Sequence, residues 1–290
     1  MGKIEEMKIL ITGAKGMLGS DLSNVLSPDY EVEGIDIEEA DITDKDKIIK
    51  LILQPKPDMV MHTAAYTDVD GCEINQKLAF LVNGKGTENV ALAAKKLKIP
   101  LLYISTDYVF NGEKKSPYIE SDIPDPINVY GKSKLKGEEY VQNLVSNYFI
   151  IRIAGLFGKN GKNFVKTILK KAKEENSLKV VADQIHSPTY TIDLAQEIKR
   201  LIKTENYGIY HITNNGKCSW FQFAQEILKS HPHLPPTTTN LVPITSKELN
   251  RPAKRPQYSV LSNKHLKDTI GDNMPSWQNA LEEYFNPLKL

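Results

Sequence analysis

The first two thirds of the chain alternate short apolar runs with amphipathic segments. The apolar runs predict strands at 7–12, 30–35, 59–64, 101–106, 149–154, 179–181 and 210–212. The segments between them predict helices near 17–26, 44–53, 75–97, 131–145 and 191–203, several of them after a Thr, Asp or Asn cap. The spacing from strand to strand is that of crossovers rather than hairpins. We therefore predict an α/β fold with a doubly wound parallel sheet.

The pattern changes after about residue 214, where the turn signal NNG precedes a short capped helix, SWFQFAQEIL, and a proline-rich stretch. We predict a dinucleotide-binding sheet domain and a smaller, mostly helical substrate lobe that covers the carboxyl edge of the sheet, where open α/β sheets bind ligands. The sheet domain is predicted at 1–154, with 178–214 returning to its sheet, and the lobe at 155–290, mainly 155–177 and 215–290.

Composition narrows the class of partner. Lys plus Arg (37) nearly balances Asp plus Glu (36), so the chain has no field that would attract nucleic acid or an anionic membrane. Its two cysteines have no regular spacing and indicate neither a disulfide framework nor a metal site. The short, charged start is unlike a signal peptide, and no apolar run approaches the length of a membrane span. We expect a cytoplasmic protein that acts on a small molecule.

A glycine-rich turn follows the first predicted strand. Gly13, Gly16 and Gly19 lie in ITGAKGMLG, between that strand and a helix, and Asp36 ends the next strand 23 residues after Gly13. This arrangement is typical of a Rossmann dinucleotide site, in which the helix N-terminus faces the pyrophosphate. Asp36 would accept hydrogen bonds from the adenosine ribose, which favours NAD(H). Lys15, inside the turn, leaves NADP(H) open as a second cofactor.

Two segments supply candidate chemistry at the same edge. Thr106 ends the fourth strand, in YISTDYVFNG, and Tyr130 and Lys134 are four residues apart in NVYGKSK, where a helix begins. We expect the ammonium to lower the pKa of the phenol so that Tyr130 can donate a proton, while Thr106 binds a substrate carbonyl oxygen. EADITD (39–44) supplies Asp41 and Ile42 as expected neighbours of the adenine, and Asp44 could equally be a helix cap.

These motifs, in this order, resemble the extended short-chain dehydrogenase/reductases. The resemblance rests on TGAKGMLG, AAYTDVD (64–70), Asn83, STDYVFNG and YGKSK. Further segments, including GKNFVKTIL, VADQIHSPT, CSWFQFAQEI and RPQYSVL, resemble the members of this family that act on dTDP-4-keto-6-deoxy sugars. The resemblance implies reduction of the C4 ketone of such a dTDP-sugar by a nicotinamide cofactor, with a homodimer allowed and no metal site indicated.

The resemblance also implies the positions that contact each ligand. For the cofactor it adds Met17, Leu18, Ile37, Ala64, Ala65, Tyr66, Asn83 and Ser105 to the residues named above. For the substrate it implies Thr67, Val69, Thr106, Asp107, Tyr108, Phe110, Asn163 and Arg255, of which Asn163 and Arg255 belong to the nucleotide side.

The chain departs from the family pattern at two positions. RIAGLFG places Gly155 where the family usually has a tryptophan that lies against the sugar, and DQIHSPT places His186 where it usually has glycine. Two alternative functions are considered. One is a nucleotide-sugar epimerase or dehydratase, although the Asp-Glu pair typical of dehydratases is absent because Tyr108 follows Asp107. The other is a non-catalytic regulatory subunit like that of methionine adenosyltransferase.

Overall fold

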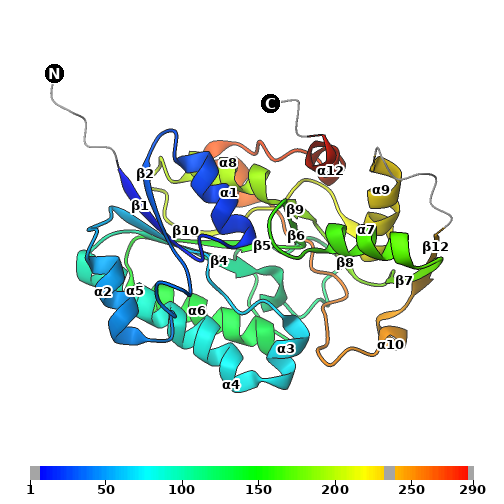
Figure 1. Cartoon of the computed structure of the whole chain (residues 1–290), viewed down its shortest axis with the longest axis horizontal. Coiled ribbons are helices and arrows are strands. Elements are labelled where there is room, and N and C mark those ends of the chain that lie inside the picture. The colour runs from blue at the N-terminus through cyan, green and yellow to red at the C-terminus, as the bar shows by residue number, and fades with distance from the viewer. Residues whose placement is uncertain (1–6, 232–238, 287–290) are drawn as a thin grey trace.

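The computed structural model describes residues 7–231 and 239–286 (Figure 1). Its centre is a six-stranded sheet with the order β2-β1-β3-β4-β5-β10. Every neighbouring pair is parallel. The strands are β1 Lys8–Thr12, β2 Glu31–Ile35, β3 Met59–His62, β4 Leu101–Thr106, β5 Tyr148–Ile153 and β10 Gly208–His211. From β1 the chain adds β2 on one side and then β3, β4 and β5 on the other side. Such a reversal of strand order is a switch point, which opens a ligand crevice at the carboxyl ends of the strands.

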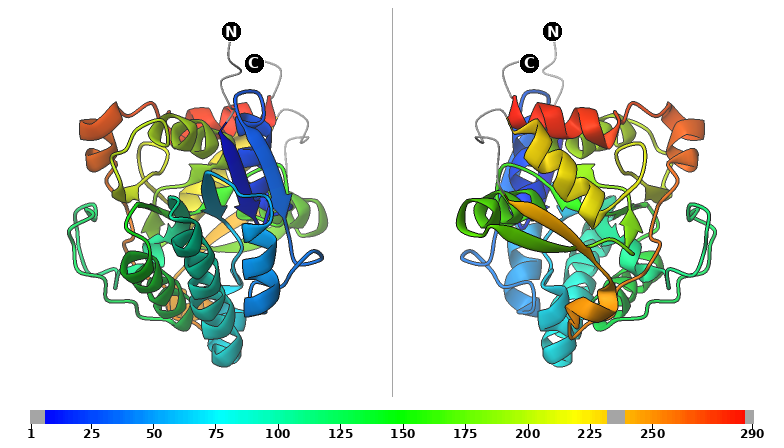
Figure 2. Two further views of the ribbon diagram at one scale, coloured as in Figure 1. Left: turned by 90° about the vertical axis from the view of Figure 1, so that its left-hand side faces the viewer. Right: turned by 90° about the vertical axis from the view of Figure 1, so that its right-hand side faces the viewer.

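Helices cover both faces of the sheet, as Figure 1 and Figure 2 show. On one face α1 (Met17–Leu26) and α8 (Thr191–Leu201) pack on the sheet through a shared apolar core. On the other face lie α2 (Lys45–Leu53), α5 (Thr87–Leu97) and α6 (Val129–Leu144). The inner strands β1, β3, β4 and β5 are almost wholly buried, which explains why they read as continuous apolar runs in the sequence, whereas the edge strand β2 is partly exposed.

The helix predicted at 75–97 is divided into three parts. It comprises α4 (Gln76–Ala79), a π-helical stretch η1 (Phe80–Gly86) and α5. The short helix α3 (Val69–Ile74) precedes it. The π-helical stretch places Asn83 and Gly84 in the buried layer beneath the loop that follows β3, and π-helical turns are frequent near functional sites.

The strand predicted at 179–181 forms, but it does not join the central sheet. It is β7 (Ser177–Val181), which pairs with β12 (Asn240–Ile244) in a separate two-stranded sheet. Alternate residues of β7 are exposed, so only one of its faces packs on a core. Residues 178–214 were expected to rejoin the central sheet domain as a whole. Only α8 and β10 of this segment pack on or join the central sheet, so the expectation is wrong for the strands β7, β8 and β9.

Most of the remaining elements form the predicted lobe around a third apolar core, beside the sheet in Figure 1, whereas α11 (Lys264–Ile270) packs on the central sheet through Leu266. Beside its helices the lobe holds three two-stranded sheets, β11-β8, β12-β7 and β6-β9. The remaining bounds are β6 Leu156–Phe157, α7 Phe164–Glu174, β8 Ile185–His186, β9 Thr189–Tyr190, β11 Cys218–Ser219, α9 Trp220–Ser230, α10 Ser246–Leu249, α11 Lys264–Ile270 and α12 Trp277–Phe285. None of the helices within the described ranges is long and apolar enough to span a bilayer.

Candidate active site

One large cavity lies at the carboxyl edge of the sheet. Its volume is about 1300 Å³, and it is lined by the loops after β1 to β5 and by segments of the lobe. Most of the residues predicted for the site contribute to its wall, including Gly13, Asp36, Thr106, Tyr130 and Arg255. The cavity therefore joins the predicted cofactor side to the predicted substrate side.

The glycines of the turn allow a close approach of backbone segments that side chains at these positions would prevent. Gly13 has φ +71°, a conformation that favours glycine, and a Cβ on it would lie 2.7 Å from the backbone nitrogen of Ala64. A Cβ on Gly19 would lie 2.2 Å from the carbonyl oxygen of Gly13. Gly16 is the N-cap of α1, so the first-turn amides of this helix meet no capping side chain. The turn fits a dinucleotide pyrophosphate. Met17 and Leu18 also line the cavity.

Asp36 and its neighbours make the ribose end of the cavity acidic. The backbone amides of Lys15 and Ile37 donate to the Asp36 carboxylate, each at 2.8 Å. The ammonium of Lys15 pairs with Glu38 at 3.0 Å and with Glu39 at 3.5 Å. Two carboxylates therefore balance the charge of Lys15. The Lys15 ammonium attracts a 2′-phosphate less strongly than its position in the sequence suggested.

The residues predicted to lie beside the adenine are in the cavity wall, and their contact with adenine stays a prediction. Ile37, Asp41 and Ile42 line the cavity. Asp44 is the N-cap of α2 and accepts from the backbone amide of Lys47, so the helix-cap alternative holds for this residue.

Asn83 lies behind the wall rather than in it. Ala64, Ala65 and Tyr66 line the cavity, whereas Asn83 is fully buried and is absent from its lining. Its amide oxygen accepts from the backbone amide of Tyr66 at 2.8 Å, and its amide nitrogen donates to the Tyr66 carbonyl and to the Ser133 hydroxyl, each at 3.0 Å. Asn83 therefore holds the loop after β3 in position, and it does not lie in the cavity wall as a direct cofactor contact would require.

Thr106, Tyr130 and Lys134 converge on the cavity from two elements. Thr106 is the last residue of β4, and the other two lie on the first turns of α6, which Asn128 caps by accepting from the Gly131 amide. Lys134 is only 3% exposed, and its ammonium lies 4.1 Å from the ring centroid of Tyr103.

The electrostatics of this group differ from the sequence prediction. Burial raises the pKa of Tyr130, the Asp107 carboxylate adds to this effect, and interaction with the Thr106 hydroxyl works in the opposite direction. Burial lowers the pKa of Lys134 to about 7. The expected lowering of the phenol pKa by the ammonium is therefore wrong for the cofactor-free protein, because both groups are removed from water. Tyr130 is held as the neutral phenol, the form that can donate a proton.

Asp107 is a further buried acid at this end of the cavity. It is 3% exposed, and its carboxylate accepts from the Thr106 hydroxyl at 3.0 Å. Burial raises the pKa of Asp107 to about 7, although hydrogen bonds from Ser259 and Thr106 oppose the shift. The sequence placed Asp107 near the substrate but gave no sign of this coupling to Thr106.

A buried ion pair fixes α6 to the sheet beneath these residues. Arg152 on β5 donates to Glu138 on α6 through Nε at 2.9 Å and through Nη2 at 2.7 Å. The Ser105 hydroxyl donates to the same carboxylate, so this cavity-lining hydroxyl is already committed to the protein. The pair joins the helix that carries Tyr130 to β5, the strand that neighbours the one carrying Thr106.

The predicted substrate residues divide into two groups. Thr67, Val69, Tyr108 and Arg255 line the cavity with Thr106 and Asp107. Phe110 does not, because its ring is fully buried and stacked on Tyr118 with centroids 4.2 Å apart.

Asn163 is likewise absent from the lining. It caps α7, accepting from the Lys166 amide at 3.0 Å and donating to the Gly158 carbonyl at 2.7 Å. Phe110 was expected in the cleft wall and Asn163 on the nucleotide side, but neither lines the cavity, since a buried ring packing and a helix cap occupy these side chains.

Two residues missed in the sequence accompany Arg255. Arg255 donates to Asp70 at 2.7 Å, and Arg251 donates to the other oxygen of this carboxylate at 2.9 Å. Although burial opposes the effect, hydrogen bonds from Arg255 and Arg251 hold the pKa of Asp70 at about 2. Asp70 thus fixes two cavity-lining guanidinium groups, which can bind a diphosphate.

The lobe contributes an aromatic and basic wall that the sequence analysis did not assign. Its residues in the cavity include Lys162, Phe164, Lys171, Lys179, His186 and Trp220. Phe164, Thr167, Ile168 and Lys171 lie on one face of α7, as expected from their helical spacing. That spacing was the available signal, but it is also the pattern of an ordinary amphipathic helix.

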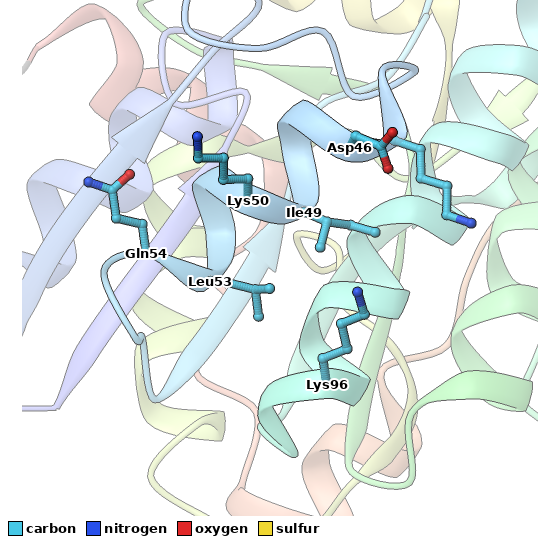
Figure 3. Close-up of a pocket in the computed structure, with 7 residues that line it drawn as sticks. Asp46, Ile49, Lys50, Leu53, Gln54 and Lys96 are labelled. Atoms are coloured by element: carbon cyan, nitrogen blue, oxygen red, sulfur yellow. The ribbon is translucent and has the colours of Figure 1, made fainter.

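A second hollow lies between α2 and α5 (Figure 3). Its volume is about 660 Å³, and it is lined by Lys45, Asp46, Ile49, Lys50, Leu53, Gln54 and Lys96. No predicted site residue lines it. Nowhere in 7–231 or 239–286 do three His, Cys, Asp or Glu side chains gather in a way that could hold a metal ion. We assign the site to the large cavity.

The chain resembles known proteins along nearly its whole length. Residues 7–290 match the family described as RmlD substrate binding domain. This chain is 40% identical to the spore coat polysaccharide biosynthesis protein SpsK of Bacillus subtilis, over 96% of each chain. It is 37% identical to dTDP-4-dehydrorhamnose reductase of Burkholderia thailandensis, over 95% of this chain and 97% of the other.

A solved structure shows the same fold. The dTDP-4-dehydrorhamnose reductase of Bacillus anthracis, crystallised in complex with NADP, superposes with a TM-score of 0.93 and 41% identity, over 97% of this chain and 99% of that one. At this coverage the likeness includes both the sheet and the lobe.

Proposed function

Because this chain belongs to the RmlD substrate binding domain family, we propose that it reduces the C4 ketone of dTDP-4-dehydro-L-rhamnose, or a close relative, to dTDP-L-rhamnose with NAD(P)H. The enzyme is an oxidoreductase with a Rossmann-type fold, as predicted from its motifs. The observation that carries the proposal is that Thr106, Tyr130 and Lys134 line the same cavity as the glycine turn.

Each residue of the cavity has a separate role in the reduction. When bound, the reduced nicotinamide supplies the hydride. The glycine turn and Asp36 would hold the dinucleotide at the switch point, and Lys134 would bind its nicotinamide ribose. Thr106 orients the ketone through its carbonyl oxygen, and Tyr130, held as a neutral phenol, gives its proton to the oxygen as negative charge develops there. Arg251 and Arg255 bind the diphosphate of the substrate.

The cofactor preference follows from the charges near the ribose. NAD(H) is favoured because Asp36, Glu38 and Glu39 lie together and Lys15 is paired. NADP(H) remains usable, and the Bacillus anthracis relative was crystallised with NADP. A cytoplasmic location and a homodimer stay predictions.

A direct assay tests the proposal. The purified protein should oxidise NADH when given dTDP-4-dehydrorhamnose, and Tyr130→Phe should lower kcat by about 10²- to 10⁴-fold, since the general acid is lost. Binding of NADH should be unchanged in this variant, because the glycine turn and Asp36 are intact.

Three results would contradict the proposal and point elsewhere. Loss of water or inversion of a sugar centre, without net oxidation of NADH, would indicate a dehydratase or epimerase. Tight cofactor binding without any turnover would favour the regulatory subunit. Equal turnover by wild type and Tyr130→Phe would remove the proton-donor role.

A further inference from the structure

Tyr103 is a buried aromatic residue that lies against Lys134 from outside the cavity. It belongs to β4, is fully buried and does not line the cavity. The Lys134 ammonium lies 4.1 Å from the centroid of its ring. The Tyr103 hydroxyl donates to the Lys134 carbonyl at 3.3 Å. The same phenol therefore contacts both the backbone and the charged end of this lysine.

The ring supplies an attraction for the ammonium that the nearby carboxylate supplies only in part. The charge of Glu138 favours the Lys134 ammonium, but this carboxylate is bound to Arg152 and to the Ser105 hydroxyl. Burial works against the ammonium and lowers the pKa of Lys134 to about 7. The face of an aromatic ring attracts a cation, more strongly where water is excluded. Because this attraction needs no acceptor atom, the ammonium keeps N–H donors for a ligand in the cavity.

A buried hydrogen-bond network holds the ring that packs on Tyr103. His62 on β3 is stacked on Tyr103, with ring centroids 5.6 Å apart and an angle of 23° between the planes. The Thr87 hydroxyl donates to the Asn83 carbonyl at 2.7 Å, so its oxygen accepts from Nε2 of His62, 3.1 Å away. Nδ1 of His62 then accepts from the Thr12 hydroxyl at 2.6 Å. Both imidazole nitrogens are thus bound, and the ring cannot turn without losing a hydrogen bond.

The network connects the glycine turn to Lys134. Thr12 ends β1, lines the cavity and comes directly before Gly13. On the other side, the Tyr103 phenol fits beneath α6 only because Gly137 has no side chain, since a Cβ there would lie 2.3 Å from the phenol oxygen. The ring of Tyr103 is therefore fixed between β3 and α6, with the Lys134 ammonium over its face.

We propose that Tyr103 is a positioning residue for the dinucleotide, whose ring face holds the Lys134 ammonium where it meets the nicotinamide ribose. This inference rests on the proposed function, in which Lys134 binds that ribose. A lysine side chain loses much rotamer freedom when its ammonium is fixed, and an ammonium already held by the ring loses less of it on binding. The role needs the electron-rich face of an aromatic ring and does not need the Tyr103 hydroxyl.

Two variants separate the ring from the hydroxyl. Tyr103→Phe keeps the ring face, whereas Tyr103→Leu removes it. Dissociation constants for NADH and for ADP, which lacks the nicotinamide ribose, are measured by calorimetry below pH 7, where Lys134 is mostly an ammonium. Tyr103→Leu should lose about 3- to 30-fold of the wild-type preference for NADH over ADP, and Tyr103→Phe should stay within about twofold of it. The affinity for ADP should not change in either variant, because the glycine turn and Asp36 are intact.

Phe149→Leu is the matched control. Phe149 is also a fully buried ring, but it lies on β5, packs in the core on the opposite face of the sheet and does not line the cavity. This control loses a ring of similar size and should keep the wild-type preference for NADH. If Tyr103→Leu also keeps it while the wild type reduces the ketone normally, the inference is overturned and the proposed function stands. If the wild type neither turns over nor prefers NADH to ADP, the proposed function fails and the inference fails with it.

A second measurement covers the case in which Tyr103→Leu does not fold. Pentafluorophenylalanine has nearly the shape of phenylalanine, but its fluorine atoms withdraw electrons from the ring face and remove the attraction for a cation. With this residue at position 103, the preference for NADH over ADP should be about 3- to 30-fold lower than in Tyr103→Phe. Equal preferences in these two proteins would show that only the shape of the side chain matters, and the inference would be overturned.

Discussion

At the scale of single residues, the Thr106 hydroxyl already has two partners within the protein. Its hydroxyl donates to the Asp107 carboxylate, and its oxygen accepts from the Tyr108 amide. A hydroxyl has one proton, so Thr106 cannot donate to Asp107 and to a ketone oxygen at the same time. Protonation of Asp107 removes this conflict, because the neutral acid can donate to Thr106 and release the threonine proton for the substrate.

This coupling predicts a pH dependence. Burial raises the pKa of Asp107 to about 7, so Asp107 is mostly protonated below pH 7 and mostly ionised above it. We expect the kcat for ketone reduction to fall as the pH rises through about 7. In Asp107→Asn the amide nitrogen can donate to Thr106 at every pH, so its kcat should fall less steeply than that of the wild type, and any remaining change reports Lys134, whose pKa is also about 7. Parallel pH profiles of kcat for the two proteins would contradict the coupling.

The sequence predicted the identity of these residues better than their environment. The spacing of Tyr130 and Lys134 and the position of Thr106 placed all three in the cavity. Their pKa values could not be read from the sequence, because burial outweighs the pairwise charge that the motif suggests. Phe110 was misplaced for a related reason, since the direction of its side chain after β4 is set by packing on Tyr118.

At the scale of elements, two loops define the cofactor end of the site. The loop between β1 and α1 carries Lys15, and the loop after β2 carries Asp36, Glu38 and Glu39. The order of strand, glycine turn and helix was predictable from local sequence. The ion pairs between the loops were not, because they join residues 23 and 24 positions apart through tertiary structure.

These ion pairs predict how the cofactor preference can be changed. The double variant Glu38→Gln/Glu39→Gln should free the Lys15 ammonium and remove two negative charges near a 2′-phosphate. We expect the ratio of kcat/KM for NADPH to that for NADH to rise by about three- to tenfold, given the modest strength of exposed ion pairs. The measurement is steady-state kinetics with each cofactor at fixed dTDP-4-dehydrorhamnose.

The strand β2, which precedes the loop that carries Glu38 and Glu39, offers a matched control. Glu31 and Glu33 on β2 hold Lys8 in the same way, at 2.8 Å and 3.3 Å, and none of the three lines the cavity. Glu31→Gln/Glu33→Gln should leave the cofactor ratio unchanged. An equal change in both double variants would show that net charge, rather than the release of Lys15, sets the preference.

At the scale of the whole molecule, the function depends on closing one cavity with two parts of the chain. The parallel sheet was predictable because its buried strands carry continuous apolar runs. The lobe was harder to predict because its short strands pair across long stretches of sequence, as β7 pairs with β12. The same long-range pairing brings His186 and Arg255 to a cavity whose other wall is made by Gly13 and Thr106.

A shared cavity predicts that the two ligands bind cooperatively. The nicotinamide end of the dinucleotide would form part of the wall of the sugar subsite, so a bound cofactor removes water that the sugar must otherwise displace. We expect NADH to tighten dTDP-L-rhamnose binding by about five- to 100-fold, with the same factor when the order is reversed, since coupling between two sites is reciprocal. Calorimetric titration of each ligand, with and without the other, measures both factors.

ADP-ribose, which lacks the nicotinamide ring, should produce much less coupling than NADH because it leaves the sugar side of the cavity open. Equal sugar affinity in the presence of NADH, in the presence of ADP-ribose and without either would show that the sheet and the lobe bind their ligands independently.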